Sequence, residues 1–286
     1  MGYNSFKDIL DECVVKDYIK NIDRRKYDGI HLSEVGCPRE YMFKVLGYPR
    51  PLPPPEDIRV LDFGSLIHDY IQKTLVRNGF VKQGDCERPI RSALYEIDSN
   101  TDIASINING EDVLIDIKTI KCGKGNFGFD GIKKPIDKHR QQVMLYMHFL
   151  NEELRRQNKK EIVRAIVVYV KKCGGTWLFP TEQKYDLLNV GLQNNGINYQ
   201  IAESHRQIDI KEFTIIYDPI EAKLYENKVA ELDRLIKIKV LPPIPDDVDT
   251  FACDNFCNYR NLCINCNDDN ENSIPKLQLT TTSYEF

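Results

Sequence analysis

The stretch from Thr101 to Lys118 reads TDIASININGEDVLIDIK, two short β-rich runs separated by Asn109-Gly110. An Asn-Gly pair between apolar runs is a strong signal for a β-hairpin. Because side chains alternate between the two faces of a strand, Asp116 and Lys118 share one face of the second run. The residues expected on the opposite, core-facing side are Val113, Ile115 and Ile117. The stretch therefore predicts a sheet that carries an acid and an ammonium on one face.

A second acid, Asp102, stands in the first run. Two carboxylates can hold Mg²⁺ or Mn²⁺ through oxygen, and a lysine beside them can steady an attacking water or the charge that develops on a phosphate. This combination is typical of a metal-dependent phosphodiesterase. Asp98 is the nearest rival for the role of Asp102, which can also be a turn residue after Ser99-Asn100-Thr101.

The register of the hairpin decides whether the two acids meet. A two-residue loop at Asn109-Gly110 would set Asp102 opposite Ile117, on the wrong face for an acid pair. We therefore predict a three-residue loop or a β-bulge, which shifts the pairing by one residue and brings Asp102 to the face of Asp116. Finding Asp102 on the opposite face of the sheet would contradict the site.

Composition sets the broad class. Of the 286 residues, 42% are hydrophobic and 10% aromatic, and the formal net charge is −4, which predicts a folded chain and argues against a surface that coats DNA throughout. The most apolar stretch, 162–170, is broken by Arg164, and no apolar run reaches the length of about 18 residues that a membrane helix needs. The N-terminus lacks a signal pattern, and Phe6 stands where a myristoylation site requires Ser or Thr. We expect a cytoplasmic protein of a bacterium, an archaeon or a phage-infected cell, with no membrane partner.

Helical and β-rich segments interleave along the chain. Helices are expected over the polar N-terminal 30 residues, from Cys37-Pro38 up to the Pro-rich bend at 49–55, and over 57–78, 136–154 and 220–237, with Gly79 as a C-cap. Beyond the hairpin, strands are expected at 162–170 and near 213–217, and a mobile loop at 123–131. This order predicts an α/β sandwich with a central mixed sheet.

Basic residues gather at two places that would form a local groove if they lie beside the acids. Taken alone they are more often solvated surface charges. The residues are Lys133, Lys134, Lys138, His139, Arg140, Lys171 and Lys172.

The nine cysteines are unevenly spread. Four lie between residues 253 and 266, and clustered thiols in an intracellular chain usually bind a metal. Four thiolates suit either a [4Fe–4S] cluster or tetrahedral Zn²⁺.

The ordered set of motifs resembles a known family, the PD-(D/E)XK nucleases of the RecB type, and within it the iron–sulfur-containing, CRISPR-associated type of exonuclease, possibly in a phage form. The motifs that carry the resemblance, and that span most of the chain, are Cys37, His68, Asp102, Asp116-Ile117-Lys118, Gln142-x-x-x-Tyr146 and Cys257-Asn258-Tyr259-Arg260-Asn261-Leu262-Cys263.

This resemblance implies a role for each matched residue. Asp102, Asp116, His68 and the carbonyl of Ile117 would ligate the divalent cation, and Lys118 would position the water nucleophile. Gln142 and Tyr146 share a helix face and would orient Lys118 or touch the DNA backbone. His68 is otherwise a partly buried helical residue, and Gln141 and His139 compete for the roles on the later helix.

The resemblance also implies a [4Fe–4S] cluster on Cys37, Cys253, Cys257 and Cys263. The family has two residues between its second and third cysteines, whereas Cys253 and Cys257 enclose three here. Zinc is therefore an open alternative, as is Cys266 as a ligand through Cys263-Ile264-Asn265-Cys266.

The resemblance implies a restriction-endonuclease-like core with helical N-terminal and C-terminal parts joined by the cysteines. We expect an N-terminal helical part at 1–56, a nuclease core at 57–180, a helical C-terminal part at 181–266 and a flexible tail at 267–286. The implied activity is a Mg²⁺- or Mn²⁺-dependent deoxyribonuclease, an exonuclease on single-stranded DNA or DNA ends in recombination, repair or phage DNA metabolism. With no Walker motif in the chain, any helicase or recombination motor is a separate partner. The rivals are a catalytically silent DNA-binding or scaffolding subunit and a zinc-stapled RNA-processing protein.

Overall fold

The computed structural model describes residues 5–23, 29–48, 52–123, 128–172, 210–244, 253 and 257–265, together with the backbone of two further strands. The helices are α1 (Phe6–Asp23), α2 (Pro38–Val45), α3 (Pro55–Arg77), α4 (Asp137–Arg156), α5 (Pro219–Ile238) and α7 (Arg260–Asn265), with short 3-10 turns at Leu32–Glu34, Gln83–Asp85 and Phe129–Gly131. The strands are β1 (Cys86–Pro89), β2 (Asn100–Ile108), β3 (Glu111–Lys121), β4 (Arg164–Lys172), β5 (Asp186–Asn194), β6 (Ile197–Glu203) and β7 (Ile210–Ile216).

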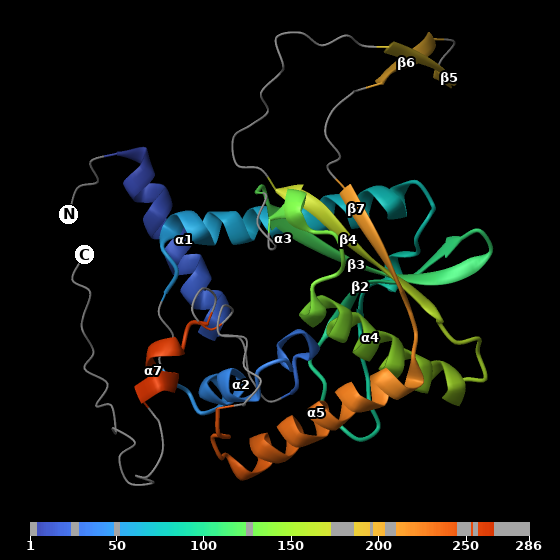
Figure 1. Ribbon diagram of the computed structural model, residues 1–286. Helices are drawn as coiled ribbons and strands as arrows, with labels where there is room; N and C mark the ends of the chain where they lie inside the picture. The colour runs from blue at the N-terminus through green and yellow to red at the C-terminus, as the bar shows by residue number, and fades with distance from the viewer. Residues whose placement is uncertain are drawn as a thin grey trace.

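Five strands form a mixed central sheet in the order β1-β2-β3-β4-β7 (Figure 1). The pair β3·β4 is parallel and is connected through α4, whereas the other neighbours are antiparallel. The predicted α/β architecture with a mixed sheet flanked by helices is confirmed. β7 belongs to this sheet, so the sheet takes a strand from the segment 181–266. The hairpin of β5 and β6 was not predicted and forms a separate two-stranded sheet.

The hairpin of β2 and β3 contains the predicted irregularity. Its turn is a two-residue loop in which Asn109 and Gly110 have φ of 56° and 82°, and the ladder starts with Ile108 opposite Glu111. Farther along, Ile103 pairs with Ile115, so the register shifts by one residue between Ile103 and Ile106. A β-bulge on β2 therefore corrects the register, as expected.

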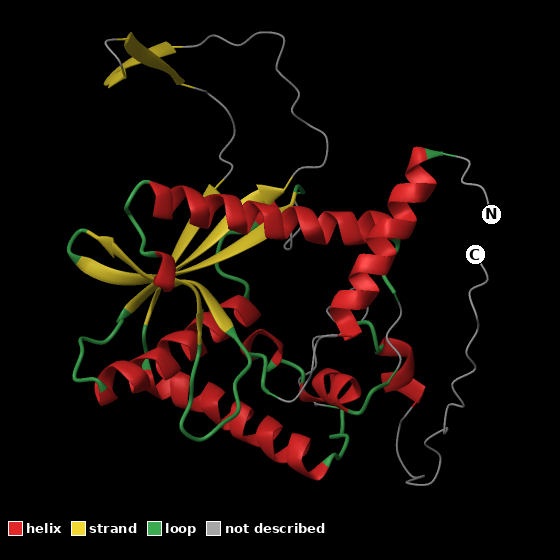
Figure 2. Ribbon diagram, turned by 180° about the vertical axis from the view of Figure 1, so that it is seen from behind, coloured by secondary structure: helices red, strands yellow, loops and turns green. Residues whose placement is uncertain are grey.

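Helices cover both faces of the sheet (Figure 2), and apolar side chains lie between the helices and the sheet. On one face, residues of α3 pack on a cluster that includes the predicted core side of β3, and the cluster consists of Val81, Ile103, Val113, Ile115, Ile117 and Ile166. On the other face, the larger cluster contains Leu114 and Val167 from the sheet and most of the buried face of α4, with α5 packed against α4. Asp116 and Lys118 alternate with the first cluster, so they lie on the α4 face of β3.

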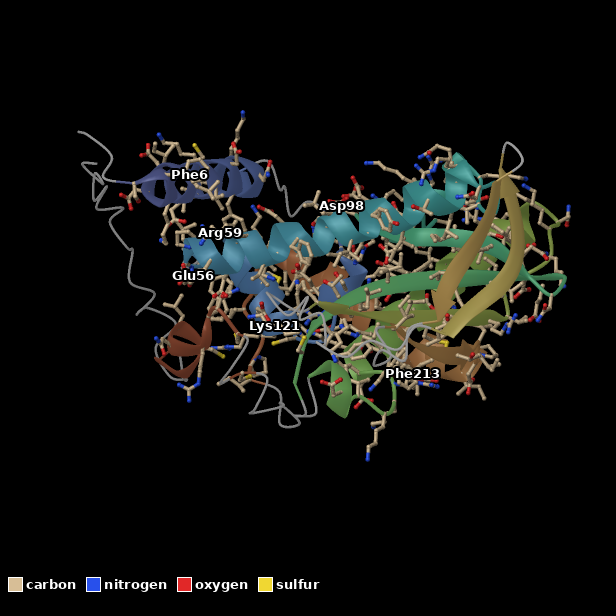
Figure 3. The ribbon with its side chains drawn as sticks, turned by 90° about the horizontal axis from the view of Figure 1, so that it is seen from above. Phe6, Glu56, Arg59, Asp98, Lys121 and Phe213 are labelled. Carbon is tan, nitrogen blue, oxygen red and sulfur yellow. The ribbon has the colours of Figure 1, made fainter. Side chains whose placement is uncertain are left out.

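The helix α3 approaches the sheet closely at Gly64. A Cβ placed on Gly64 would lie 2.8 Å from Thr119 Oγ1, which explains why a residue without a side chain stands there. Lys172 donates a hydrogen bond of 2.8 Å to the carbonyl of Val60. Lys121, at the end of β3 and labelled in Figure 3, lies 3.9 Å from a carboxylate oxygen of Asp57. These contacts fix α3 along the sheet.

The ends of the helices follow their sequence signals. Pro38 and Pro55 stand in the first turns of α2 and α3. Gly79 has φ of 76°, and the bonds from Gly79 N to Val76 O and from Phe80 N to Leu75 O form a Schellman motif. Gly79 therefore ends α3, as the first residue after the C-cap Asn78 and not as the C-cap itself.

The C-terminal cysteine segment docks on α2. The rings of Phe43 and Tyr259 stack with centroids 5.2 Å apart and an interplanar angle of 19°, and both side chains are buried. The phenol of Tyr259 also donates to the carbonyl of Tyr48 at 3.5 Å. Segments more than 200 residues apart in the chain are thereby brought together. No helix among the described residues is long and apolar enough to cross a membrane.

Candidate functional site

Asp116 is the most deeply buried acid of the sheet, with 1% of its surface exposed. Lys118 Nζ donates to Asp116 Oδ1 at 3.0 Å, whereas Oδ2 is buried and has no hydrogen-bond partner among the described residues. Burial raises the pKa of Asp116 to about 6; Lys118 opposes this shift and the charge of Asp102 adds to it. A buried carboxylate with one oxygen unused fits a cation ligand, since a buried acceptor without a partner is costly.

Lys118 remains an ammonium in this environment. Burial by itself would lower its pKa, but the charges of Asp116 and Asp102 outweigh burial and raise the pKa above its ordinary value. Lys118 therefore acts as a hydrogen-bond donor and a positive charge. It is not suited to take up a proton.

Asp102 is held between β3 and α3. Its Oδ2 accepts a hydrogen bond of 2.5 Å from the backbone N–H of Ile117, and its Oδ1 lies 3.3 Å from His68 Nδ1. Ile103 pairs with Ile115 on the face that α3 covers, so the neighbouring Asp102 lies on the same face as Asp116, whose pKa responds to both Asp102 and His68. The sequence-predicted residues His68, Asp102, Asp116 and Lys118 are brought into one neighbourhood from α3, β2 and β3.

Only some of the ligand atoms of the three predicted cation ligands lie close to one another. Within the described ranges, the ligand atoms of His68, Asp102 and Asp116 do not all lie within 4.8 Å of one another. The reason is visible in their bonds, because one oxygen of Asp102 is bound to the N–H of Ile117 and one oxygen of Asp116 is bound to Lys118. The remaining oxygens are the ones able to hold a cation.

Gln142 and Tyr146 share the inner face of α4, as their spacing predicts. Gln142 Nε2 donates to Tyr146 OH at 2.6 Å, and both side chains are buried. Burial and the negative charges of Asp116 and Asp102 raise the pKa of Tyr146, so this phenol stays neutral. The two residues contact each other, and the charges of the acid pair act on the pKa of Tyr146.

Sequence reasoning missed two residues that position Asp102. Gln72 donates a hydrogen bond of 3.1 Å to the carbonyl of Asp102 and one of 2.6 Å to Glu87. Gln72 follows His68 by four residues, so it repeats the same face of α3 one turn later. This four-residue spacing is the sequence feature from which Gln72 could have been predicted. Glu87 has a φ of 48°, a backbone feature that its sequence does not indicate.

The basic residues that the sequence singled out are mostly engaged in contacts. His139 is buried, lies 2.9 Å from Tyr169 OH, and has its pKa lowered to about 2 by burial and by the charges of Lys118 and Lys138. Arg140 donates two hydrogen bonds to the carboxylate of Glu221, and further contacts join Lys134 to Asp137, Lys171 to Asp130 and Lys172 to the carbonyl of Val60. Lys138 is close enough to Lys118 for the charge of Lys118 to add to the lowering of its pKa that burial causes.

Four described cysteines lie near one another. Cys37 is the N-cap of α2, where its sulfur accepts from Glu40 N at 3.5 Å. Burial raises its pKa, and the charges of Cys253 and Cys263 add to the shift; the pKa of Cys257 is likewise raised by burial and by Cys37 and Cys263. No three of these sulfurs lie within 4.8 Å of one another. Cys266 and the tail at 267–286 lie outside the described residues, as do residues 124–127 of the expected mobile loop.

A group able to hold a metal ion lies elsewhere, at the contact of α4 and α5. It consists of His148, Glu152 and Glu226, whose ligand atoms all lie within 4.8 Å of one another. Sequence reasoning missed this group. The signal for half of it was present, since His148 and Glu152 are one helical turn apart.

Comparisons with known proteins leave the family open. No family model matches the chain, and no curated protein matches it. A solved structure titled "Crystal structure of SSO0001" is 16% identical, covering 90% of this chain and 95% of that chain with a TM-score of 0.47. A likeness at this level decides neither the fold family nor the function.

Proposed function

We propose that the chain is a metal-dependent deoxyribonuclease with a restriction-endonuclease-like core, hydrolysing phosphodiester bonds by attack of water. The observation that supports this most is Asp116, a buried carboxylate with one oxygen bound to Lys118 and the other without a partner among the described residues. Asp102 and His68 lie next to it. Two acids, an imidazole and an ammonium at one point of a sheet are the groups that this hydrolysis needs.

Asp116, Asp102 and His68 would hold Mg²⁺ or Mn²⁺, with the carbonyl of Ile117 as a further ligand. When bound, the cation would stabilise the negative charge that develops on the phosphate. The oxygen of Asp116 that lacks a partner, together with the hard oxygen donors of both acids, fits such an ion.

The protein's own groups have separate tasks. Lys118 keeps its proton, so it can orient the attacking water and stabilise negative charge on the phosphate oxygens. Gln142 and Tyr146 are hydrogen-bonded to each other on the inner face of α4 and would supply polar groups to the site from that side. Lys138, whose charge interacts with that of Lys118, supplies a second cation for the DNA backbone.

Single-stranded DNA or DNA ends are the substrate we propose, in recombination, repair or phage DNA metabolism. A net charge of −4 requires the DNA contacts to be local. Any unwinding motor is a separate protein.

We further propose that Cys37, Cys253, Cys257 and Cys263 hold a [4Fe–4S] cluster. A tetrahedral zinc site with Zn–S bonds of 2.3 Å sets its sulfurs about 3.8 Å apart. The described cysteines do not reach that spacing, since no three of their sulfurs lie within 4.8 Å of one another. The wider arrangement favours a larger metal centre, and a brown anaerobic preparation with visible absorption tests this against a colourless zinc protein.

Digestion of end-labelled oligonucleotides tests the proposed activity. Single-stranded DNA, duplex DNA and RNA are incubated with the full chain under Mg²⁺ or Mn²⁺, and the expected result is cleavage of DNA. Asp116→Ala and Lys118→Ala should abolish cleavage while DNA binding largely persists. Asp112→Asn is the matched control, because Asp112 is an exposed acid on the same strand outside the site.

Two outcomes would overturn the proposal. The absence of DNA cleavage by the wild-type chain under either metal would favour a DNA-binding or scaffolding subunit. Cleavage of RNA alone would favour an RNA-processing protein.

A further inference from the structure

His148 stands buried between two carboxylates at the contact of α4 and α5. Its Nε2 lies 3.3 Å from Glu226 Oε2 and 3.8 Å from Glu152 Oε1, and the side chains of His148 and Glu226 are 10% and 4% exposed. These three residues come from two helices that meet across 78 positions of the chain, and none of them belongs to the proposed nuclease site. A buried arrangement of this kind calls for a positive charge at its centre.

The spacing of the ligand atoms matches a small tetrahedral metal ion. Zinc bonds to nitrogen and oxygen of about 2.0–2.2 Å place neighbouring ligand atoms about 3.4 Å apart in a tetrahedron. The two distances from His148 Nε2 bracket that value. The cysteine sulfurs described above do not fit a zinc tetrahedron in this way.

The imidazole of His148 is oriented by its other nitrogen. Nδ1 lies 3.0 Å from Tyr217 OH, whereas Nε2 is buried and has no hydrogen-bond partner among the described residues despite the two nearby carboxylates. Glu152 Oε1, at 3.8 Å, lies beyond hydrogen-bond distance, and Glu226 Oε2, at 3.3 Å, makes no hydrogen bond with Nε2. A histidine that is fixed through one nitrogen and presents the other to a cation is the usual arrangement at metal sites.

The charges at this group are compatible with a bound divalent cation. Burial would raise the pKa of Glu226, yet Lys223 and His148 more than offset burial and keep the pKa below its ordinary value, so Glu226 is ionised. Lys223 Nζ lies 2.6 Å from Glu226 Oε2, but the Lys223 side chain is 64% exposed and can withdraw into solvent. Tyr95 OH donates to the other oxygen of Glu226 at 3.3 Å and holds the carboxylate in place.

We propose that His148, Glu152 and Glu226 form a second metal site, for a divalent transition ion of the Zn²⁺ type, that ties α5 to α4. One imidazole and two carboxylates favour such an ion over Mg²⁺ or Ca²⁺, which prefer oxygen alone. Three protein ligands leave one position for water. The site is separate from the acid pair on β2 and β3 and does not depend on the proposed nuclease activity.

Metal-binding stoichiometry tests this site. The full chain is stripped with a chelator and dialysed against Zn²⁺ and Co²⁺, with the wild type compared with His148→Gln, Glu152→Gln and Glu231→Gln. Glu231→Gln is the matched control, because it removes an exposed acid of α5 outside the group. The wild type and Glu231→Gln should bind about one equivalent more than the other two variants. All four proteins keep every cysteine and both acids of the nuclease site, so metal bound there contributes equally to each.

Stability gives a second measurement. Saturating Zn²⁺ should raise the thermal midpoint of the wild type and of Glu231→Gln more than that of Glu152→Gln. Glu152 is partly exposed and its amide variant should fold, so the test stands even if His148→Gln does not fold. Equal stoichiometry and equal stabilisation in the wild type and Glu152→Gln would overturn the proposal.

Discussion

The carboxylate of Asp102 accepts a hydrogen bond from the backbone N–H of Ile117 at 2.5 Å. This bond fixes a side chain of β2 to the backbone of β3 between the other two residues of the proposed site, Asp116 and Lys118. The bond also explains why only Oδ1 of Asp102 faces His68. The position of the first acid is therefore set by the neighbouring strand.

Replacing Asp102 by asparagine should distinguish the role of its negative charge from that of its hydrogen bond to Ile117. The amide oxygen can still accept from Ile117 N–H, so the free energy of unfolding should change by no more than about 1 kcal/mol. Loss of the negative charge should lower the proposed DNA cleavage by about 100-fold or more. The rate of single-turnover cleavage and urea unfolding measure the two effects.

Asp98→Asn is the control for this change. Asp98 was the rival acid in the sequence, and its side chain is 65% exposed and lies 3.6 Å from His31. Its amide variant should leave cleavage unchanged. A loss of cleavage in Asp98→Asn with none in Asp102→Asn would reverse the assignment of the two acids.

Inserting an alanine after Ser105 should move the register by one residue. The bulge already takes up one extra residue of β2 between Ile103 and Ile106, so with a second extra residue Asp102 would lie opposite Ile117, on the face that α3 covers. A carboxylate placed among the isoleucines of that face should cost about 3 kcal/mol or more of unfolding free energy. Urea unfolding compares this variant with Ser105→Ala, which keeps the register and should stay within about 1 kcal/mol of the wild type. An insertion variant as stable as the wild type would show that the bulge does not fix the register.

The parts of the fold that local signals govern could be predicted. The Asn109-Gly110 turn and the Gly79 cap each depend on a left-handed backbone conformation that few residues adopt. The bulge could be predicted because the polar face of β3 leaves only one register in which Asp102 joins it. These features depend on neighbours within about 20 residues.

Contacts between distant segments could not be predicted in the same way. Glu226 meets His148 only because α5 packs on α4, and no periodicity in the chain encodes that packing. The link from Gln72 to Glu87 requires a positive φ at Glu87, a residue type that rarely adopts one. The convergence of Cys37 with Cys253, Cys257 and Cys263 was predicted from the family resemblance, and their metal remains a proposal.

The buried imidazole of His139 should make stability depend on pH. Its pKa is lowered from an ordinary value of 6.5 to about 2, chiefly by burial, so the folded chain keeps it neutral where the unfolded chain takes up a proton. Its contribution to stability is therefore complete above pH 6.5 and declines as the pH falls toward 2. From pH 6.5 to about 5 the loss should be about 2 kcal/mol.

The variant His139→Gln isolates this effect. Glutamine can still pair with Tyr169 OH but does not titrate, so the stability of the wild type relative to the variant should shrink as the pH falls from about 7 to 5. Chemical unfolding at several pH values measures the difference, in which the other titrating groups cancel. A difference that stays constant over this range would mean that His139 is solvated in the folded chain.

Replacing Cys37 by serine should report on the proposed cluster without weakening α2. The sulfur of Cys37 caps this helix by accepting from Glu40 N, and a serine hydroxyl is a better N-cap, so the helix itself should not lose stability. Loss of a ligand to a metal centre that joins α2 to the cysteine segment should instead remove the visible absorption and lower the thermal midpoint. Cys13→Ser is the matched control, since Cys13 is exposed on α1 and is not among the proposed ligands. If Cys37→Ser retained the absorption and the midpoint of the wild type, Cys37 would not be a ligand. Contacts such as the stack of Phe43 on Tyr259 and the hydrogen bond from Tyr259 to Tyr48 would then join α2 to the cysteine segment.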